Sequence, residues 1–148
     1  MSKQISIRCT DDFAMGCYRA EPVDAASGAI VVIQEIFGVN THIREVADGY
    51  AASGYSVYAP KLFDRIRPDI ELGYGESDMA QGIDLAFNKL DLAQVINDVQ
   101  ATVDRIIADG EQKIGLVGFC FGGLVSWLSA AQVSGLSAAV GYYGGGIA

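Results

Sequence analysis

The sequence has 148 residues, of which 18 are acidic and 10 are basic, so the formal net charge at pH 7 is −8. A chain of this length can form one domain, residues 1–148, and bury a substantial hydrophobic core without disulfides or metals. The negative charge repels phosphate groups, which argues against nucleic acid and against anionic membrane surfaces as partners.

The cysteines and the apolar segments bear on cellular location. The three cysteines, Cys9, Cys17 and Cys120, have neither C-x-x-C spacing nor a histidine at zinc-ligand spacing, so we expect free thiols and no metal site. No apolar run approaches the ~20 residues that span a bilayer, and the first residues alternate polar and apolar instead of forming a signal-peptide core. These features favour a cytoplasmic protein.

The N-terminal part of the chain predicts an edge hairpin followed by a central strand. Residues 4–9 and 17–20 have the pattern of two short strands joined by a polar turn. Residues 28–38 contain a continuous apolar run bounded by glycines, which is typical of a parallel strand buried on both faces.

A helix and another buried strand come next. Residues 41–53 place apolar side chains at helical spacing, with Thr41 as the N-cap and Gly54 as the stop. Residues 55–60 have the pattern of a second buried strand. Residues 61–88 show the weakest periodicity, and we expect there a long irregular connection of the kind that often carries function.

The remaining segments complete an α/β pattern. Residues 90–108 form a strongly amphipathic helix, 113–119 a strand, 121–132 a helix and 136–145 a strand. Strands that alternate with helices of this length predict a mostly parallel sheet with helices on both faces. Ligands bind such sheets at the carboxyl ends of the strands, where this chain carries Glu35 and Cys120.

Cys120 lies in a motif that suggests a nucleophile. Gly118 and Gly122 frame it as G-x-C-x-G between a strand and a helix, which is the pattern of a sharp elbow that exposes a nucleophile. The N–H of Phe121 would then lie at a helix N-terminus, where an oxyanion or thiolate is stabilised. Two alternatives remain open. Cys120 could be a buried cysteine that only fills space, or the glycines could form a phosphate-binding turn. The second alternative is weaker, because the glycines lack the G-x-G-x-x-G spacing.

Glu35 is the second candidate, because a charged residue at the end of a buried strand needs a partner or a cavity. It could accept the thiol proton of Cys120, or hold the neutral thiol by a hydrogen bond. The alternative is that Glu35 only stabilises the start of the helix that follows.

Three segments together resemble the dienelactone hydrolase family of α/β-hydrolases: QEIFGVN (34–40), GFCFGG (118–123) and GYYG (141–144). The resemblance covers the chain from about residue 28 onward and implies an α/β-hydrolase sheet that stops before its last strands.

The resemblance also implies a chemistry and a set of roles. Cys120 would be the nucleophile, Glu35 would hold or take its proton, and the backbone N–H groups of Ile36 and Phe121 would form the oxyanion hole. The substrate would be a small-molecule lactone or ester, cleaved through an acyl-thioester without a metal or organic cofactor.

Two departures from the family pattern bear on this implication. The family's triad aspartate and histidine follow the GYYG segment, and here the sequence ends at Ala148. We expect His42 to be a surface residue and not a substitute for the triad histidine. The stretch that should supply an arginine for a substrate carboxylate has none, and we expect Arg65 and Arg67 to solvate a loop.

From the first departure we expect residues 1–148 to be the N-terminal portion of a hydrolase. The apolar strand at 136–145 would then present an open sheet edge, through which the protein could self-associate.

Two rival functions remain. A cysteine-based sensor or enzyme of the glutamine-amidotransferase-like superfamily would also combine an elbow cysteine with an upstream glutamate. A non-catalytic α/β-hydrolase-like binding module would explain a chain without a triad histidine.

Overall fold

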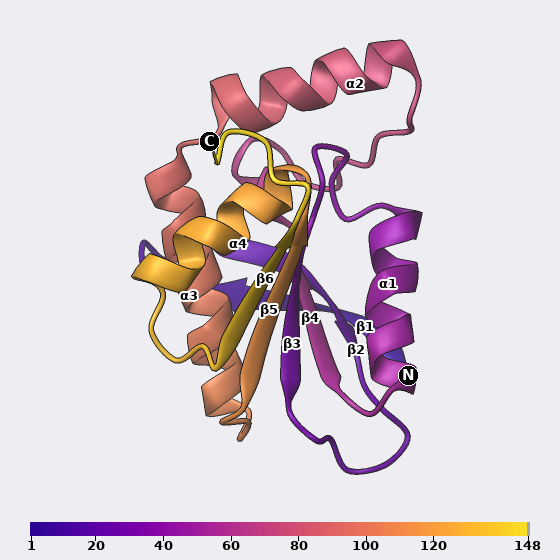
Figure 1. Ribbon diagram of the computed structural model, residues 1–148, viewed down its shortest axis with the longest axis vertical. Helices are drawn as coiled ribbons and strands as arrows, with labels where there is room; N and C mark the ends of the chain where they lie inside the picture. The colour runs from indigo at the N-terminus through magenta and orange to yellow at the C-terminus, as the bar shows by residue number, and fades with distance from the viewer. Residues whose placement is uncertain (148) are drawn as a thin grey trace.

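Six strands form one mixed sheet in the computed structural model, which describes residues 1–147 (Figure 1). The strand order is β1-β2-β4-β3-β5-β6; β1 and β2 form an antiparallel hairpin, β2 pairs antiparallel with β4, and β3 to β6 are parallel. The strands are β1 (Ser2–Arg8), β2 (Ala14–Ala20), β3 (Ala29–Ile33), β4 (Ser56–Pro60), β5 (Ile114–Phe119) and β6 (Ala138–Tyr142).

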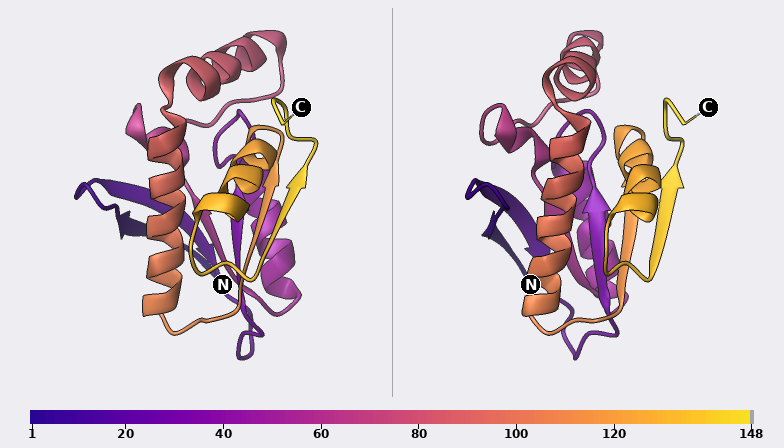
Figure 2. Two further views of the ribbon diagram at one scale, coloured as in Figure 1. Left: turned by 60° about the vertical axis from the view of Figure 1, so that its left-hand side comes forward. Right: turned by 90° about the vertical axis from the view of Figure 1, so that its left-hand side faces the viewer.

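Helices cover both faces of the sheet. Helix α1 packs on one face, α3 and α4 pack on the other, and α2 lies beyond the carboxyl ends of the parallel strands (Figures 1 and 2). The helices are α1 (Thr41–Ala52), the 3₁₀-helix η1 (Leu62–Arg65), α2 (Glu76–Ile83), the π-helix η2 (Asp84–Lys89), α3 (Leu92–Ala108) and α4 (Phe121–Gln132). Of these helices, none has the length and apolar character needed to cross a bilayer.

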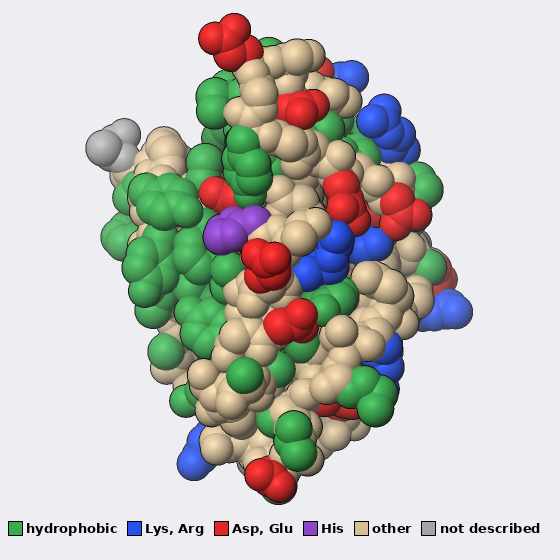
Figure 3. All heavy atoms as spheres, turned by 90° about the vertical axis from the view of Figure 1, so that its right-hand side faces the viewer, with side chains coloured by type: hydrophobic (Ala, Val, Ile, Leu, Met, Phe, Trp, Pro, Cys, Tyr) green, Lys and Arg blue, Asp and Glu red, His purple; other side chains and the backbone are tan. Residues whose placement is uncertain are grey.

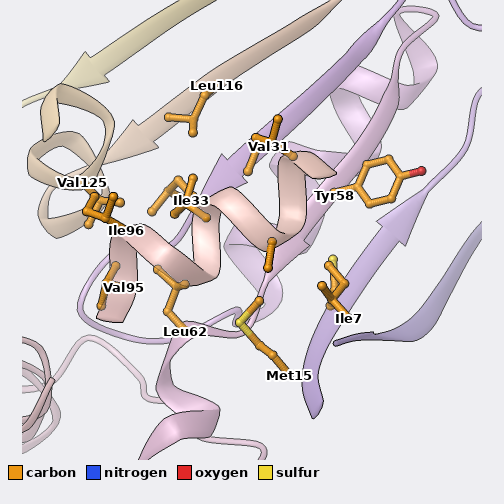
Figure 4. Packing of buried hydrophobic residues seen from close by; sticks show 14 of the residues in the cluster. Ile7, Met15, Val31, Ile33, Tyr58, Leu62, Val95, Ile96, Leu116 and Val125 are labelled. Atoms are coloured by element: carbon orange, nitrogen blue, oxygen red, sulfur yellow. The ribbon is translucent and has the colours of Figure 1, made fainter. Parts of the chain in front are cut away.

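The core consists of two apolar layers that share the central strands. Along β3, Val31 and Ile33 face the α3–α4 layer, whereas Val32 faces the α1 layer, and all three are fully buried. Figure 4 shows part of the larger layer, with Ile33 near Ile96 of α3. This burial on both faces explains the unbroken apolar run that predicted a central strand.

The predicted α/β architecture is confirmed, with differences at two places. The N-cap of α1 is Asn40, whose side-chain oxygen accepts from the N–H of Ile43 at 3.2 Å, and Thr41 is the first helical residue. The prediction of Thr41 was wrong because the Asn40 amide is also held from outside the helix, by the Leu72 carbonyl and the Tyr74 hydroxyl.

The irregular connection predicted for residues 61–88 was also wrong, since η1, α2 and most of η2 lie within it. In α2 and η2 the buried residues are Gly82, Leu85 and Ala86, and the other positions are exposed or partly exposed. One large apolar residue and two small ones make a weak hydrophobic periodicity, so the sequence pattern missed the helix.

Strand β6 lies at the edge of the sheet, and its outer side has no further strand among residues 1–147. Val140 and Tyr142 are each 48% exposed. With Ile30 and Tyr50 they line an apolar depression between the sheet and α1, part of the broad apolar area in Figure 3.

Candidate active site

Cys120 lies in the sharp turn between β5 and α4. Its backbone has φ 57° and ψ −117°, a strained conformation that non-glycine residues rarely adopt and that is often found at functional sites. The turn is held by backbone hydrogen bonds: the N–H of Cys120 donates to the Tyr142 carbonyl at 3.0 Å, and its carbonyl accepts from the N–H groups of Gly123 at 2.8 Å and Leu124 at 3.3 Å. These contacts leave the thiol half-buried at the carboxyl end of the sheet.

Two glycines allow the elbow to close. A Cβ atom on Gly118 would collide with the Gly122 carbonyl and the Ser126 hydroxyl. A Cβ on Gly122 would lie 2.5 Å from the carbonyl oxygens of Ile33 and Gln34. The start of α4 therefore packs directly on the end of β3, and this close approach brings the Cys120 turn to the segment that carries Glu35.

Glu35 follows β3 by two residues and is 9% exposed. Both of its carboxylate oxygens accept a tyrosine hydroxyl: Tyr74 donates to Oε1 at 3.3 Å and Tyr143 to Oε2 at 3.5 Å. Tyr74 in turn accepts from the Asn40 amide at 3.1 Å. Three separate segments of the chain thus orient one nearly buried carboxylate.

The pKa values of Tyr74 and Tyr143 are both raised, in part because the two hydroxyls lie beside Glu35. Burial, followed by electrostatic interaction with Glu35 and with Cys120, raises the pKa of Tyr143. Burial also raises the pKa of Tyr74, the Asn40 hydrogen bond partly offsets this, and the charge of Glu35 adds to it. Both hydroxyls therefore remain protonated donors at neutral pH, and Tyr143 lies within electrostatic reach of Glu35 and of Cys120.

The two expected oxyanion donors belong to the two segments that carry Glu35 and Cys120. Ile36 belongs to the tight turn 35–38, in which Glu35 and Gly38 form an isolated bridge. Phe121 is the first residue of α4, where backbone N–H groups have no acceptor within the helix.

His42 is exposed on the first turn of α1, as expected from the sequence. It lines a surface depression with Glu35 and Tyr74 and is the purple side chain beside the apolar area in Figure 3. Tyr74 had no signal in the sequence, because it lies in the segment without periodicity.

Arg65 does not solvate a loop, and this prediction was wrong. Its guanidinium pairs with the fully buried Asp98 at 2.7 and 3.0 Å, and with Asp11, and it lies over the Phe13 ring. The arginine is therefore committed to a structural ion-pair cluster. Arg67 is exposed.

Within residues 1–147, no group of three or more His, Cys, Asp or Glu side chains has the arrangement of a metal site.

The chain matches a known protein family over most of its length. The model described as "Dienelactone hydrolase family" matches residues 15–148, which is most of the chain. The chain belongs to the dienelactone hydrolase family.

Individual relatives agree with this assignment. A carboxymethylenebutenolidase of Pseudomonas putida is 32% identical over 149 residues, covering 99% of this chain and 63% of that protein. A Synechocystis protein assigned as a carboxymethylenebutenolidase is 37% identical over 134 residues, covering 88% of this chain and 54% of that protein. The chain thus spans between about half and two thirds of the length of these relatives.

A solved structure supports the same fold. The crystal structure of a Klebsiella pneumoniae protein assigned as a dienelactone hydrolase has a TM-score of 0.82 and 31% identity to this chain. The match covers 97% of this chain and 60% of that structure.

Proposed function

We propose that this chain carries the nucleophile and the oxyanion hole of a hydrolase that acts on small-molecule lactones or carboxylic esters. The thiolate of Cys120 attacks the carbonyl carbon, and the tetrahedral intermediate collapses with release of the alcohol or enol oxygen. An acyl-thioester remains, and water then cleaves it to the carboxylic acid and the free thiol.

The single observation that carries this proposal is the elbow conformation of Cys120, a cysteine at φ 57° between a strand and a helix N-terminus. A cysteine that only filled space would not require a strained backbone, since ordinary backbone conformations accommodate a buried thiol. The N-terminus of α4 stabilises the thiolate before attack.

The surroundings support roles for the other residues. Glu35, held by Tyr74 and Tyr143, takes or holds the thiol proton. The N–H groups of Ile36 and Phe121 receive the oxyanion. This chemistry requires neither a metal nor an organic cofactor.

The substrate class follows by analogy with the relatives named carboxymethylenebutenolidases, and an enol-lactone is the best first candidate. A cytoplasmic location and the absence of nucleic-acid and membrane partners stay predictions from the sequence.

A burst experiment with p-nitrophenyl acetate tests the nucleophile. We expect the protein to release up to one equivalent of p-nitrophenol per chain in a rapid phase, and Cys120→Ala to abolish that phase. Equal release by both proteins would contradict the proposal. Rapid oxidation of Cys120 by peroxide without any acylation would support the rival sensor function instead.

Glu35→Gln tests the proton acceptor with little change in shape. We expect the acylation rate constant to fall by roughly 10²- to 10⁴-fold, the usual contribution of a positioned general base. Glu45→Gln is the matched control, because Glu45 is exposed on α1, and it should acylate at the unaltered rate. An unchanged rate in Glu35→Gln would remove Glu35 from the mechanism.

We also propose that the outer side of β6 can pair with another copy of the chain. The exposure of Val140 and Tyr142 on an edge strand supports this, because unpaired strand edges are templates for association.

A further inference from the structure

Helix α2 makes an unusually close contact with the turn that carries Ile36. A Cβ atom on Gly82 would collide with the carbonyl oxygen of Ile36 and lie 3.1 Å from its Cγ1. The helix backbone therefore packs directly on the Ile36 residue, and any side chain at position 82 would displace it. Because φ and ψ of Ile36 link its carbonyl to its own N–H, such a displacement also moves that N–H group.

The same turn is held from its other end. Gly38 has φ 80°, and a Cβ atom there would collide with the Ile70 carbonyl. The Phe37 carbonyl accepts from the N–H of Leu72 at 2.9 Å. With one end fixed by residues 70–72, the contact with Gly82 determines how the Ile36 peptide is oriented.

The π-helical extension of α2 reaches the other side of the site. The ring of Phe87 packs edge-on against Phe121, with ring centroids 5.7 Å apart. Phe121 directly follows Cys120 and begins α4. A single helical segment, 76–89, thus contacts both residues whose N–H groups were assigned to the oxyanion hole.

The helix geometry explains how one segment makes both contacts. In a regular α-helix, two residues five positions apart, such as Gly82 and Phe87, are rotated by roughly 140° from each other. A π-helix has a wider turn than an α-helix, because its hydrogen bonds join residues i and i+5, so each of its residues is rotated by a smaller angle from the one before. Gly82 belongs to α2 and Phe87 to the π-helix η2 (Asp84–Lys89), so Phe87 lies closer to the side of Gly82 than a continuous α-helix would place it.

We propose that helix α2 with η2 sets the geometry of the oxyanion hole, and that Gly82 and Phe87 are its positioning residues. Gly82 holds the Ile36 N–H, and Phe87 holds the Phe121 end of α4. This inference rests on the proposed function, and it assigns to the segment 76–89 a role in the reaction that requires no contact with the substrate.

Two reactions of Cys120 separate this role from general damage. Acylation by p-nitrophenyl acetate passes through an oxyanion, whereas alkylation by iodoacetamide displaces iodide and forms none. A misplaced oxyanion hole slows the first reaction only. A misfolded site, or a thiol that is no longer activated, alters both.

We expect Gly82→Ala to acylate about 10- to 100-fold more slowly than the unaltered protein, because small misplacements of catalytic groups have effects of this size. Its alkylation rate should stay within about twofold of the unaltered protein, and its KM should change little compared with its acylation rate constant. Gly49→Ala is the matched control, since Gly49 lies in α1 with no atom within 4 Å of the added Cβ, and both of its rates should be unchanged.

A second variant guards against failure of Gly82→Ala to fold. Phe87→Leu removes the ring contact with Phe121 and keeps an apolar side chain, and we expect a smaller but selective loss of acylation. Ile83→Ala, at an exposed position of the same helix, should have no effect.

Unchanged acylation in folded Gly82→Ala or Phe87→Leu would overturn the inference, and so would parallel losses of the acylation and alkylation rates. If the unaltered protein itself showed no acylation, the proposed function would fail instead.

Discussion

Cys120 illustrates how one residue can be both strained and well placed. Its positive φ is stabilised by hydrogen bonds from the turn to the Tyr142 carbonyl and from Gly123. The other two cysteines have ordinary roles: Cys9 and Cys17 are 3% and 0% exposed and pack in the core. The contrast gives a direct test of which thiol is available for chemistry.

At pH 8 we expect iodoacetamide to modify Cys120 alone. Burial raises the pKa of both Cys9 and Cys17 to about 12, and the negative charge of Asp98 adds to the effect at Cys9. A thiol with such a pKa is ionised to about one part in ten thousand at pH 8, and these two are also inaccessible. Mass spectrometry should find one adduct per folded chain and three after denaturation. Modification of Cys9 or Cys17 in the folded protein would contradict the buried placement.

The residues around Glu35 differ in how far the sequence could predict them. Glu35 stood out because a charge after an apolar strand is unusual, and Tyr143 because it belongs to a recognisable GYYG segment. Tyr74 gave no such signal. Its hydroxyl reaches Glu35 across 39 positions in the chain, and this contact depends on the path of the whole segment between them.

At the scale of elements, the strand–elbow–helix unit formed by β5 and α4 was predicted almost to the residue. Its signals are local, because an apolar strand, a small-residue turn and a helix follow one another directly. The elbow also shows how tightly two elements can pack when a side chain is missing.

Gly118→Ala should destabilise the protein by roughly 1–3 kcal/mol, the typical cost of overpacking, because the added methyl group collides with the Gly122 carbonyl. Gly115→Ala is a control within the same strand, since no atom lies within 4 Å of its added Cβ. Urea unfolding of both variants measures the difference in the free energy of unfolding. Equal stabilities would mean that the elbow is looser than described.

The helical segment 76–89 marks the limit of element prediction. Only Gly82, Leu85 and Ala86 are buried in this segment, and two of the three are small, so its hydrophobic pattern is weak. Its position follows from contacts with Ile36 and Phe121, which belong to distant parts of the chain.

At the scale of the whole molecule, Arg65 joins three parts of the fold. Its bidentate pair with Asp98 of α3, and its contacts with Asp11 and Phe13 beside the β1–β2 hairpin, connect η1 to both. Asp98 is fully buried, so it depends on this partner.

Arg65→Met should therefore reduce the free energy of unfolding by about 3–5 kcal/mol, because it leaves the buried charge of Asp98 without its cationic partner. The double variant Arg65→Met/Asp98→Leu should recover most of that loss, since it removes both charges. Denaturant unfolding of the two variants provides the measurement. A double variant as unstable as the single one would indicate that the loss comes from packing and not from the unpaired charge.

The β6 edge gives a prediction about assembly. Val140→Lys places a charge on the exposed side of an edge strand, which disfavours pairing with another copy. We expect light scattering after size-exclusion chromatography to show a smaller mass for this variant than for the unaltered protein. Val23→Lys, at a fully exposed position outside the strands, should leave the mass unchanged. A monomer in every case would contradict self-association through β6.

The sequence by itself determined the succession of the six strands and of α1, α3 and α4 along the chain, the mostly parallel sheet, the elbow and the family resemblance, because these depend on periodicity and motifs within short stretches. Only the tertiary structure decided which distant groups meet: Tyr74 with Glu35, Arg65 with Asp98, and α2 with the turn at Ile36. These contacts join residues from 33 to 46 positions apart, and no local pattern specifies them. They depend instead on how the sheet and its helices pack around a common core.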